Sequence, residues 1–209
     1  MKAKDLDFDK ERFLKFKTEK RLNKLIDVLS KRQKDLSVIL ENINDPHNMS
    51  AALRSCDAVG IMNVKMIYNG RQPIPKIGKT SSASAKKWVE KELFNSAEDC
   101  FERVRSTGKK IYTTHMSSGA VSLYDLDLTE PVALMFGNEH SGISEEALEM
   151  ADGNFLIPQI GMIQSLNISV AVAVSVFEAF RQRLKAGMYD DIQFEENEFL
   201  NKLDEWVRK

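Results

Sequence analysis

The chain has 209 residues, of which 43% are apolar and 29% are charged, and its formal net charge is −1. These values are typical of a globular protein that buries a core without disulfide staples. There is no secretory signal pattern, no apolar run long enough to span a bilayer, and no zinc-type spacing among the histidines or cysteines. We therefore expect a cytoplasmic protein without membrane association or a metal site, in which Cys56 and Cys100 are reduced, buried thiols.

The first predicted element is a basic helical arm. Residues 10–34 contain ten Lys or Arg and three acids. Within the predicted helix 19–33, the apolar residues recur at helical spacing, namely Leu22, Leu25, Ile26 and Leu29. One face is thus apolar and the other is basic. A basic segment on a balanced chain indicates a polyanionic partner or a solvated helix face, and charge alone does not decide between them.

The remaining chain alternates between predicted strands and helices. Strands are predicted at 36–43, 61–68, 109–116, 131–137 and 154–158, and helices at 48–60, 96–108, 144–151 and 195–209. A loop rich in Gly, Pro, Ser and Lys covers 69–87. The alternation predicts an α/β fold with a mainly parallel sheet, helices on both faces and short helical extensions at both ends. We divide the chain into a basic arm (1–34), a main domain (35–187) and an acidic helical extension (188–209).

Ligands of such folds bind beyond the carboxyl ends of the strands, and three segments leave strand ends with polar side chains. The first, ENINDPHNMSAALRS, opens a helix with Asn48 and carries Arg54 six residues later. The guanidinium either binds a phosphate or pairs with a structural carboxylate. The second, LMFGNEHSGIS, holds Glu139 between two glycines at P-loop spacing. Ile143 stands where a P-loop has its lysine, and the chain has no G-x-G-x-x-G, so both phosphate-binding fingerprints are absent.

The third segment, IPQIGMIQSLNISVAVAV, starts at Ile157 and enters the most apolar predicted helix. We expect Gln164, Ser165 and Asn167 in the first turn of that helix. A single polar side chain there is explained as a helix cap, but two in series together with Gln164 exceed what a cap requires. An apolar wall with a few converging polar groups is the usual composition of a small-ligand site.

Together, NMSAALR (48–54), FGNEHSGIS (136–144) and IPQIGMIQSLNISVAVAV (157–174) resemble the three motifs of the SpoU family of RNA 2'-O-ribose methyltransferases, which belongs to the SPOUT class of S-adenosylmethionine-dependent enzymes. The motifs occur in family order, and the similarity covers roughly residues 20–189. The segments LIDVLSKRQKDLSVILENINDPHN and EAFRQRLKAGMY are most similar to the branch that methylates guanosine 18 in the D-loop of tRNA.

The resemblance implies a deep C-terminal trefoil knot, which is so rare that nothing else in the sequence would suggest it. It also implies a homodimer through the last helix of the catalytic domain. The residues expected to hold S-adenosylmethionine are Thr114, Gly137, Ile157, Ile160, Gly161 and Leu166. The residues expected to form the catalytic cluster are Asn48, Arg54, Glu139, Ser165 and Asn167. The residues expected to bind tRNA are Lys17, Lys20, Arg21, Lys24 and Arg32 in the arm, with Lys79 and Lys86 in the loop.

A ribose 2'-hydroxyl is a poor nucleophile, so the site must orient it and assist loss of its proton. The family proposal makes Arg54 the base. Because a guanidinium keeps its proton up to about pH 12, the alternatives are that Arg54 clamps a phosphate or stabilises the developing alkoxide. The segment after Asp190 is acidic, which departs from a basic clamp and leaves more of the tRNA contact to the arm and the loop.

Three alternatives remain open from the sequence. The same chemistry on ribosomal RNA is one, although only about 35 residues precede the first predicted strand, which favours tRNA. A non-catalytic RNA-binding protein of the same fold is the second, and the complete set of motif residues argues against it. An unrelated α/β enzyme acting on a nucleotide is the third, and the missing phosphate-binding fingerprints count against it.

Overall fold

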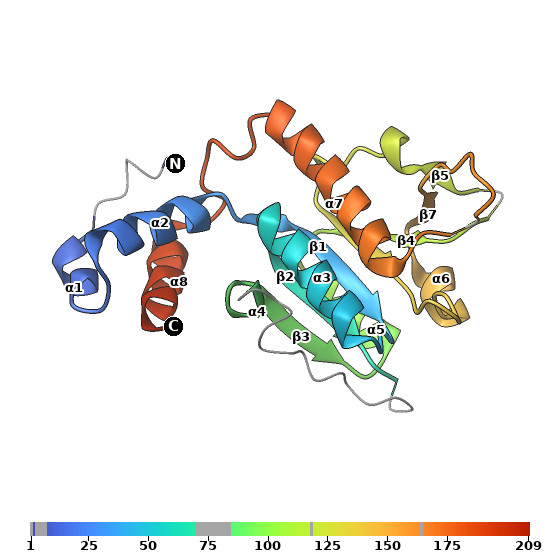
Figure 1. Cartoon of the computed structure of the whole chain (residues 1–209), viewed down its shortest axis with the longest axis horizontal. Coiled ribbons are helices and arrows are strands. Elements are labelled where there is room, and N and C mark those ends of the chain that lie inside the picture. Colours follow the sequence, from blue (N-terminus) through green and yellow to red (C-terminus); the bar gives the residue numbers. More distant parts are fainter. Residues whose placement is uncertain (1, 3–7, 70–84, 118, 164) are drawn as a thin grey trace.

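In the computed structural model, the described residues 2, 8–69, 85–117, 119–163 and 165–209 build one seven-stranded sheet with helices on both faces (Figure 1). The strands are β1 (Gln33–Glu41), β2 (Ile61–Ile67), β3 (Glu90–Phe94), β4 (Lys110–Thr114), β5 (Val121–Ser122), β6 (Val132–Phe136) and β7 (Gly153–Leu156). The helices are α1 (Lys10–Leu14), α2 (Glu19–Ser30), α3 (Pro46–Ala58), α4 (Ala85–Trp88), α5 (Ala97–Arg105), η2 (Leu123–Asp125), α6 (Glu145–Met150), α7 (Ile168–Lys185) and α8 (Glu196–Arg208).

The strand order is β3-β2-β1-β6-β4-β7-β5, and every pairing between the described strands is parallel. The predicted α/β fold with a mainly parallel sheet is therefore confirmed. All five residues of β6 are buried, as are the last six of β1. Such continuously buried, mostly apolar runs suit a sheet that is covered on both faces. The knot implied by the family resemblance stays a prediction.

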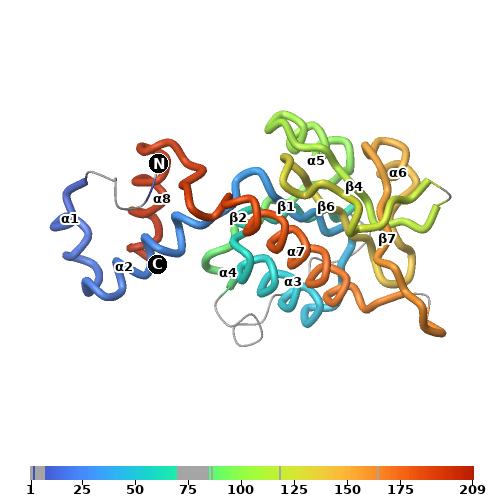
Figure 2. Tube along the Cα trace, turned by 90° about the horizontal axis from the view of Figure 1, so that it is seen from above, coloured from blue at the N-terminus to red at the C-terminus, as the bar shows by residue number. Residues whose placement is uncertain are grey.

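Two helical layers cover the sheet. On one face, α3 and α7 lie side by side and share a core with Val38 and Phe136 (Figure 2). On the other face, α5 and α6 pack on Ile39 and Met135. Neighbouring residues of one strand point to opposite faces, so β1 and β6 supply both cores. None of the described helices has the length and apolarity needed to cross a bilayer.

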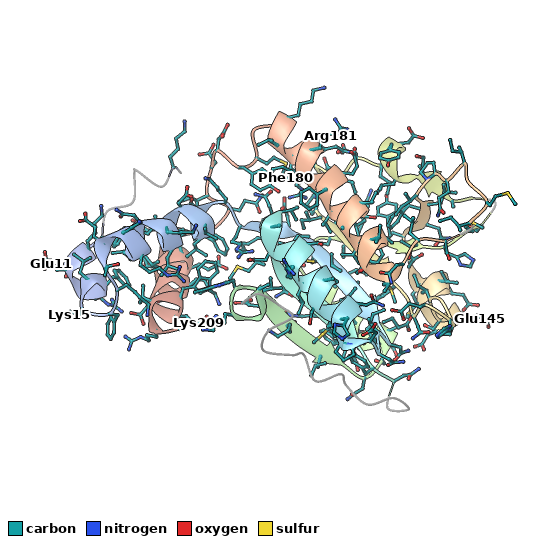
Figure 3. All side chains as sticks on the ribbon, viewed as in Figure 1. Glu11, Lys15, Glu145, Phe180, Arg181 and Lys209 are labelled. Carbon is teal, nitrogen blue, oxygen red and sulfur yellow. The ribbon has the colours of Figure 1, made fainter. Side chains whose placement is uncertain are left out.

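The two chain ends form a third core, which also includes Met62 at the start of β2. Helices α1, α2 and α8 pack together around the buried side chains of Leu22, Phe199 and Trp206. We call α1, α2 and α8 the helical cap; Glu11 on α1 and Lys15 directly after it lie at the end of the cap that is far from the sheet (Figure 3). The basic arm and the acidic extension thus fold against each other. Charge complementarity supports this contact: Arg12 pairs with Asp204 at 3.2 Å, and Lys34 pairs with Glu198 at 2.5 Å.

Arg32 joins the helical cap to the sheet rather than facing solvent. Its side chain is fully buried, pairs with the carboxylate of Asp57 and donates to the carbonyl oxygen of Ile61 at 3.0 Å. Its guanidinium also lies over the ring of Trp206, 5.2 Å from the centroid. The prediction that Arg32 binds RNA is therefore wrong, because a buried, paired guanidinium cannot reach a phosphate.

The structure differs from the predicted elements mainly where charge masks a strand or a helix is short. Strand β3, whose EKELF sequence shows no clean apolar alternation, was not predicted, and neither were the short elements α1, α4, β5 and η2. The predicted helix 19–33 ends at Ser30, and Arg32 lies outside it. The helix expected to contain Ser165 and Asn167 in its first turn starts at Ile168, with Asn167 as its N-cap. Most of the predicted loop 69–87 lies outside the described residues.

Candidate active site

Four adjacent strands bring their carboxyl ends to one edge of the sheet. In the order β1, β6, β4, β7, these strands are followed by the turn into α3, the turn into α6, the segment from His115 and the segment into α7. The three motif segments leave β1, β6 and β7, so the fold brings them together at this edge. This is the edge where ligands of parallel α/β folds bind.

A cavity of about 1180 Å³ opens beside these strand ends. Eight of the eleven residues predicted for the cofactor and catalytic sites line it, namely Thr114, Gly137, Glu139, Ile157, Gly161, Ser165, Leu166 and Asn167. Ile160 does not line it, and its side chain is fully exposed. Sequence reasoning missed His115 and Met116, which also line the cavity. Their position directly after strand β4 could have identified them, because strand ends form the edge of the site.

Three side chains from three different segments form a continuous hydrogen-bonded array. The amide nitrogen of Asn48 (Nδ2) donates to Glu139 Oε1 at 2.6 Å, and Asn167 Nδ2 donates to Asn48 Oδ1 at 3.2 Å. We call Glu139, Asn48 and Asn167 the polar array. Because Glu139 accepts only, it dictates that Asn48 turns its nitrogen toward it and its oxygen toward Asn167.

Local structure holds the two asparagines of the polar array. Asn48 lies in the first turn of α3, which Asp45 caps by accepting from the backbone nitrogen of His47 at 2.8 Å. Pro46 occupies the first position of that helix, where no backbone donor is needed. Asn167 caps α7, since its Oδ1 accepts from the backbone nitrogen of Ser169 at 2.9 Å and from its hydroxyl at 2.6 Å.

The turn that carries Glu139 requires its first glycine. A Cβ on Gly137 would lie 2.3 Å from the carbonyl of Gly142, closer than any side chain tolerates. Gly142 itself has a φ of +69°, which favours glycine. Asn138 and Gly142 also exchange two backbone hydrogen bonds of 2.9 Å. The turn therefore folds back tightly beneath Glu139 and exposes its backbone to the cavity.

A family model described as the SpoU rRNA Methylase family matches residues 35–177, which contain the polar array and all of the sheet except the first two residues of β1. The chain belongs to the SpoU family. A relative from Thermus thermophilus, a tRNA (guanosine(18)-2'-O)-methyltransferase, is 43% identical over 193 residues, covering 92% of this chain and 98% of the relative.

Solved structures agree with this membership of the SpoU family. The Aquifex aeolicus TrmH/SpoU tRNA modifying enzyme matches with a TM-score of 0.85 and 38% identity, covering 91% of this chain and 96% of that one. The SpoU methyltransferase AviRb from Streptomyces viridochromogenes, in complex with the cofactor AdoMet, matches with a TM-score of 0.65 and 26% identity, covering 76% and 64% of the two chains.

Two SpoU motif residues stand outside the polar array. Arg54 is exposed on α3, and its side chain makes no hydrogen bond or ion pair with any described residue. Six residues of helix rotate it about a third of a turn away from Asn48, so the two side chains leave neighbouring sides of α3. Ser165 lies in the cavity wall just before α7, and its hydroxyl likewise has no partner among the described residues. Both groups are available to a ligand.

The residues that were predicted to bind tRNA lie in different environments. Lys20 and Lys24 are exposed on α2, and Lys17 is half-buried just before it. Arg21 is exposed and lies over the ring of Trp88, 5.5 Å from the centroid. Lys79 and the side chain of Lys86 lie outside what the structure describes. The exposed candidates in the described part of the chain, Lys20, Arg21 and Lys24, all lie on α2.

Proposed function

We propose that this chain transfers the methyl group of S-adenosylmethionine to the ribose 2'-hydroxyl of guanosine 18 in tRNA. The observation that carries the proposal is the polar array at the wall of the cavity, built from all three SpoU motifs. The family match and the tRNA (guanosine(18)-2'-O)-methyltransferase relative support it. We assign the methyl transfer to the domain of residues 35–187. We place the protein in the cytoplasm.

The cavity fits a nucleoside cofactor. Its walls combine apolar side chains, such as Ile157 and Leu166, with turn backbone at Gly137 and Gly161 and the polar Thr114. Because Gly137 has no Cβ, the turn leaves room that a side chain would fill. A few polar groups on an apolar wall suit an adenosine ligand. When bound there, S-adenosylmethionine supplies an electrophilic methyl group.

The polar array is built to orient a ribose. Each amide nitrogen carries two N–H groups and uses one within the array, so Asn48 and Asn167 each retain one donor. The free hydroxyl of Ser165 lies in the same cavity wall. These donors hold the ribose oxygens so that the 2'-hydroxyl lies in line with the reacting methyl. Glu139 keeps Asn48 from rotating.

Arg54 binds the nucleic acid rather than the protein. An exposed guanidinium without a partner among the described residues is free to form a bidentate contact with a phosphate. Its place on α3 brings a tRNA phosphate toward the polar array, to which Asn48 belongs. A cation there also stabilises the negative charge that develops on the 2'-oxygen as its proton leaves.

The basic face of α2 binds the tRNA backbone. The pairing of Arg12 and Lys34 with α8 removes part of the arm's charge, and the predicted residues Lys17, Lys20, Arg21 and Lys24 remain as cations for RNA. The double variant Lys20→Glu, Lys24→Glu should weaken tRNA binding and reduce the slope of log affinity against log salt by about 2. Lys110→Glu, at an exposed position on β4, controls for the effect of one charge reversal outside α2. Unchanged affinity and slope in the double variant would contradict this assignment.

Two copies of the chain form a homodimer through the exposed side of α7. Val170, Phe177 and Leu184 recur every seven residues and are 46%, 48% and 54% exposed, so they form one apolar stripe along the helix. We expect a dimer in sedimentation velocity and a monomer for Phe177→Asp. Tyr124→Asp, at an equally exposed aromatic residue in η2, should remain dimeric. A monomeric wild-type chain would refute this interface.

A transfer assay tests the function against its alternatives. The purified chain is incubated with labelled S-adenosylmethionine and either an unmodified tRNA transcript or a 23S ribosomal RNA transcript. Nuclease digestion should release labelled 2'-O-methylguanosine from the tRNA only. Label in the ribosomal transcript alone would establish the ribosomal alternative. Cofactor binding without transfer to either RNA would indicate a non-catalytic RNA-binding protein.

A further inference from the structure

The end of β1 has an unusual backbone that is held from two sides. Asn42 has a φ of +53° and is the one non-glycine residue with a positive φ in the described part of the chain. This conformation is costly for a side-chain-bearing residue and persists only where neighbours hold it. Its backbone nitrogen donates to the carbonyl of Ile67 at 2.9 Å, and its carbonyl oxygen accepts from Asn138 Nδ2 at 2.8 Å.

Asn138 uses nearly all of its hydrogen-bonding capacity on protein. Its Oδ1 accepts from the backbone nitrogens of His140 at 2.9 Å and Ser141 at 3.2 Å, while Nδ2 reaches Asn42. Only this orientation of the amide satisfies all three partners. The residue is 9% exposed. Its side chain therefore connects the turn after β6 to the end of β1 through hydrogen bonds.

The hydrogen bond between Asn138 and Asn42 lies at the base of the polar array. Glu139 directly follows Asn138, and Asn48 follows Asn42 by six residues. The two turns therefore touch twice: at the base through Asn138 and Asn42, and at the tip through Glu139 and Asn48. We propose that Asn138 is a positioning residue, which sets the Glu139 carboxylate against Asn48 by clamping the turn to Asn42. This inference rests on the proposed function.

A second tether means that loss of the clamp should shift the turn without unfolding it. The carboxylate of Glu41, 3% exposed, accepts from the backbone nitrogen of Ser144 at 2.9 Å and from its hydroxyl at 2.7 Å. This bond pair holds the far end of the turn, and the backbone bonds between Asn138 and Gly142 join residues 138 and 142 across the turn. The hydrogen bond that ties the near end of the turn, next to Glu139, to Asn42 comes from the Asn138 side chain.

The substitution Asn138→Asp tests the clamp. Aspartate has the same shape and still accepts from His140 and Ser141, but it no longer donates to the carbonyl of Asn42. We expect kcat for tRNA methylation to fall about 10- to 100-fold, because a displacement of about 1 Å can cost about 100-fold in rate. The Kd for S-adenosylmethionine, measured by calorimetry, should change less than about threefold.

Two further variants separate positioning from a merely structural effect. Ser96→Ala removes the N-cap of α5, where Ser96 accepts from the nitrogen of Asp99 at 3.1 Å, and should lower Tm while leaving kcat unchanged. If Asn138 acts through Glu139, the double variant Asn138→Asp, Glu139→Ala should be no slower than Glu139→Ala alone in single turnover. Rate losses that multiply, or a normal kcat for Asn138→Asp, would overturn the clamp. Absence of transfer by the wild-type chain would instead refute the proposed function.

Discussion

Asn167 performs two tasks that a single substitution can separate. Its Oδ1 caps α7, and its Nδ2 donates to Asn48. Asp and Asn are about equally good N-caps, so Asn167→Asp should keep the cap and lose only the donor. Asn167→Ala loses both. The cap contributes about 1 kcal/mol and a hydrogen bond about 1 kcal/mol, so the alanine variant should lose about 2 kcal/mol, or about 4–8 °C in Tm.

The predicted signature is a rate loss without a matching stability loss. Asn167→Asp should melt within about 4 °C of the wild-type chain, because only one hydrogen bond is lost. Its single-turnover rate should nevertheless fall about 10- to 100-fold, equivalent to about 1.4–2.7 kcal/mol of transition-state stabilisation. Thermal melting and single-turnover methylation of tRNA measure the two quantities. A wild-type rate for Asn167→Asp would show that Asn167 is only a helix cap and would refute the array as the ribose-binding device.

Three other substitutions or treatments give distinct results. Arg54→Ala should abolish nearly all turnover, with less than about a threefold change in cofactor Kd by calorimetry, and near-normal turnover would exclude both the clamp and the alkoxide role. Arg32→Ala should lower the free energy of unfolding, measured with denaturant, by about 2–3 kcal/mol, because it leaves the Asp57 carboxylate without its partner. The affinity for tRNA should stay within about twofold. A large loss of tRNA affinity in the folded variant would show that Arg32 belongs to the RNA-binding surface. Burial raises the pKa of the Cys56 and Cys100 thiols to about 12. Neither thiol should therefore react with a disulfide reagent at pH 8 until the chain unfolds. Rapid labelling of the folded protein would contradict their burial.

The sheet was predictable where burial leaves a strong pattern. The continuous apolar run of β6 predicts a strand that is covered on both faces, and the structure confirms it. Strand β3 was not predictable in the same way, because it lies at the sheet edge and carries Glu90, Lys91 and Glu92 in succession. Edge strands commonly carry such charges, which hide them from a hydrophobicity pattern.

The site was predictable in its members but not in its contacts. The motifs identify Asn48, Glu139 and Asn167, yet their hydrogen bonds join residues 91 and 119 positions apart and depend on the order of β1, β6 and β7 in the sheet. Arg32 is a residue that the sequence pattern assigned to the site and that the fold buries instead. A run of basic residues predicts a solvated face, and nothing local reveals that one member pairs with Asp57, 25 residues away, inside the protein.

The ribose itself provides the most direct test of the central claim. Two tRNA transcripts, identical except for a 2'-deoxyguanosine at position 18, would be incubated with labelled S-adenosylmethionine and the purified chain. The account predicts label in the ribose-containing transcript and none in the deoxy transcript, because the polar array presents only a 2'-oxygen to the methyl group. Equal label in both transcripts would place the methyl elsewhere on the tRNA and contradict the assignment of guanosine 18.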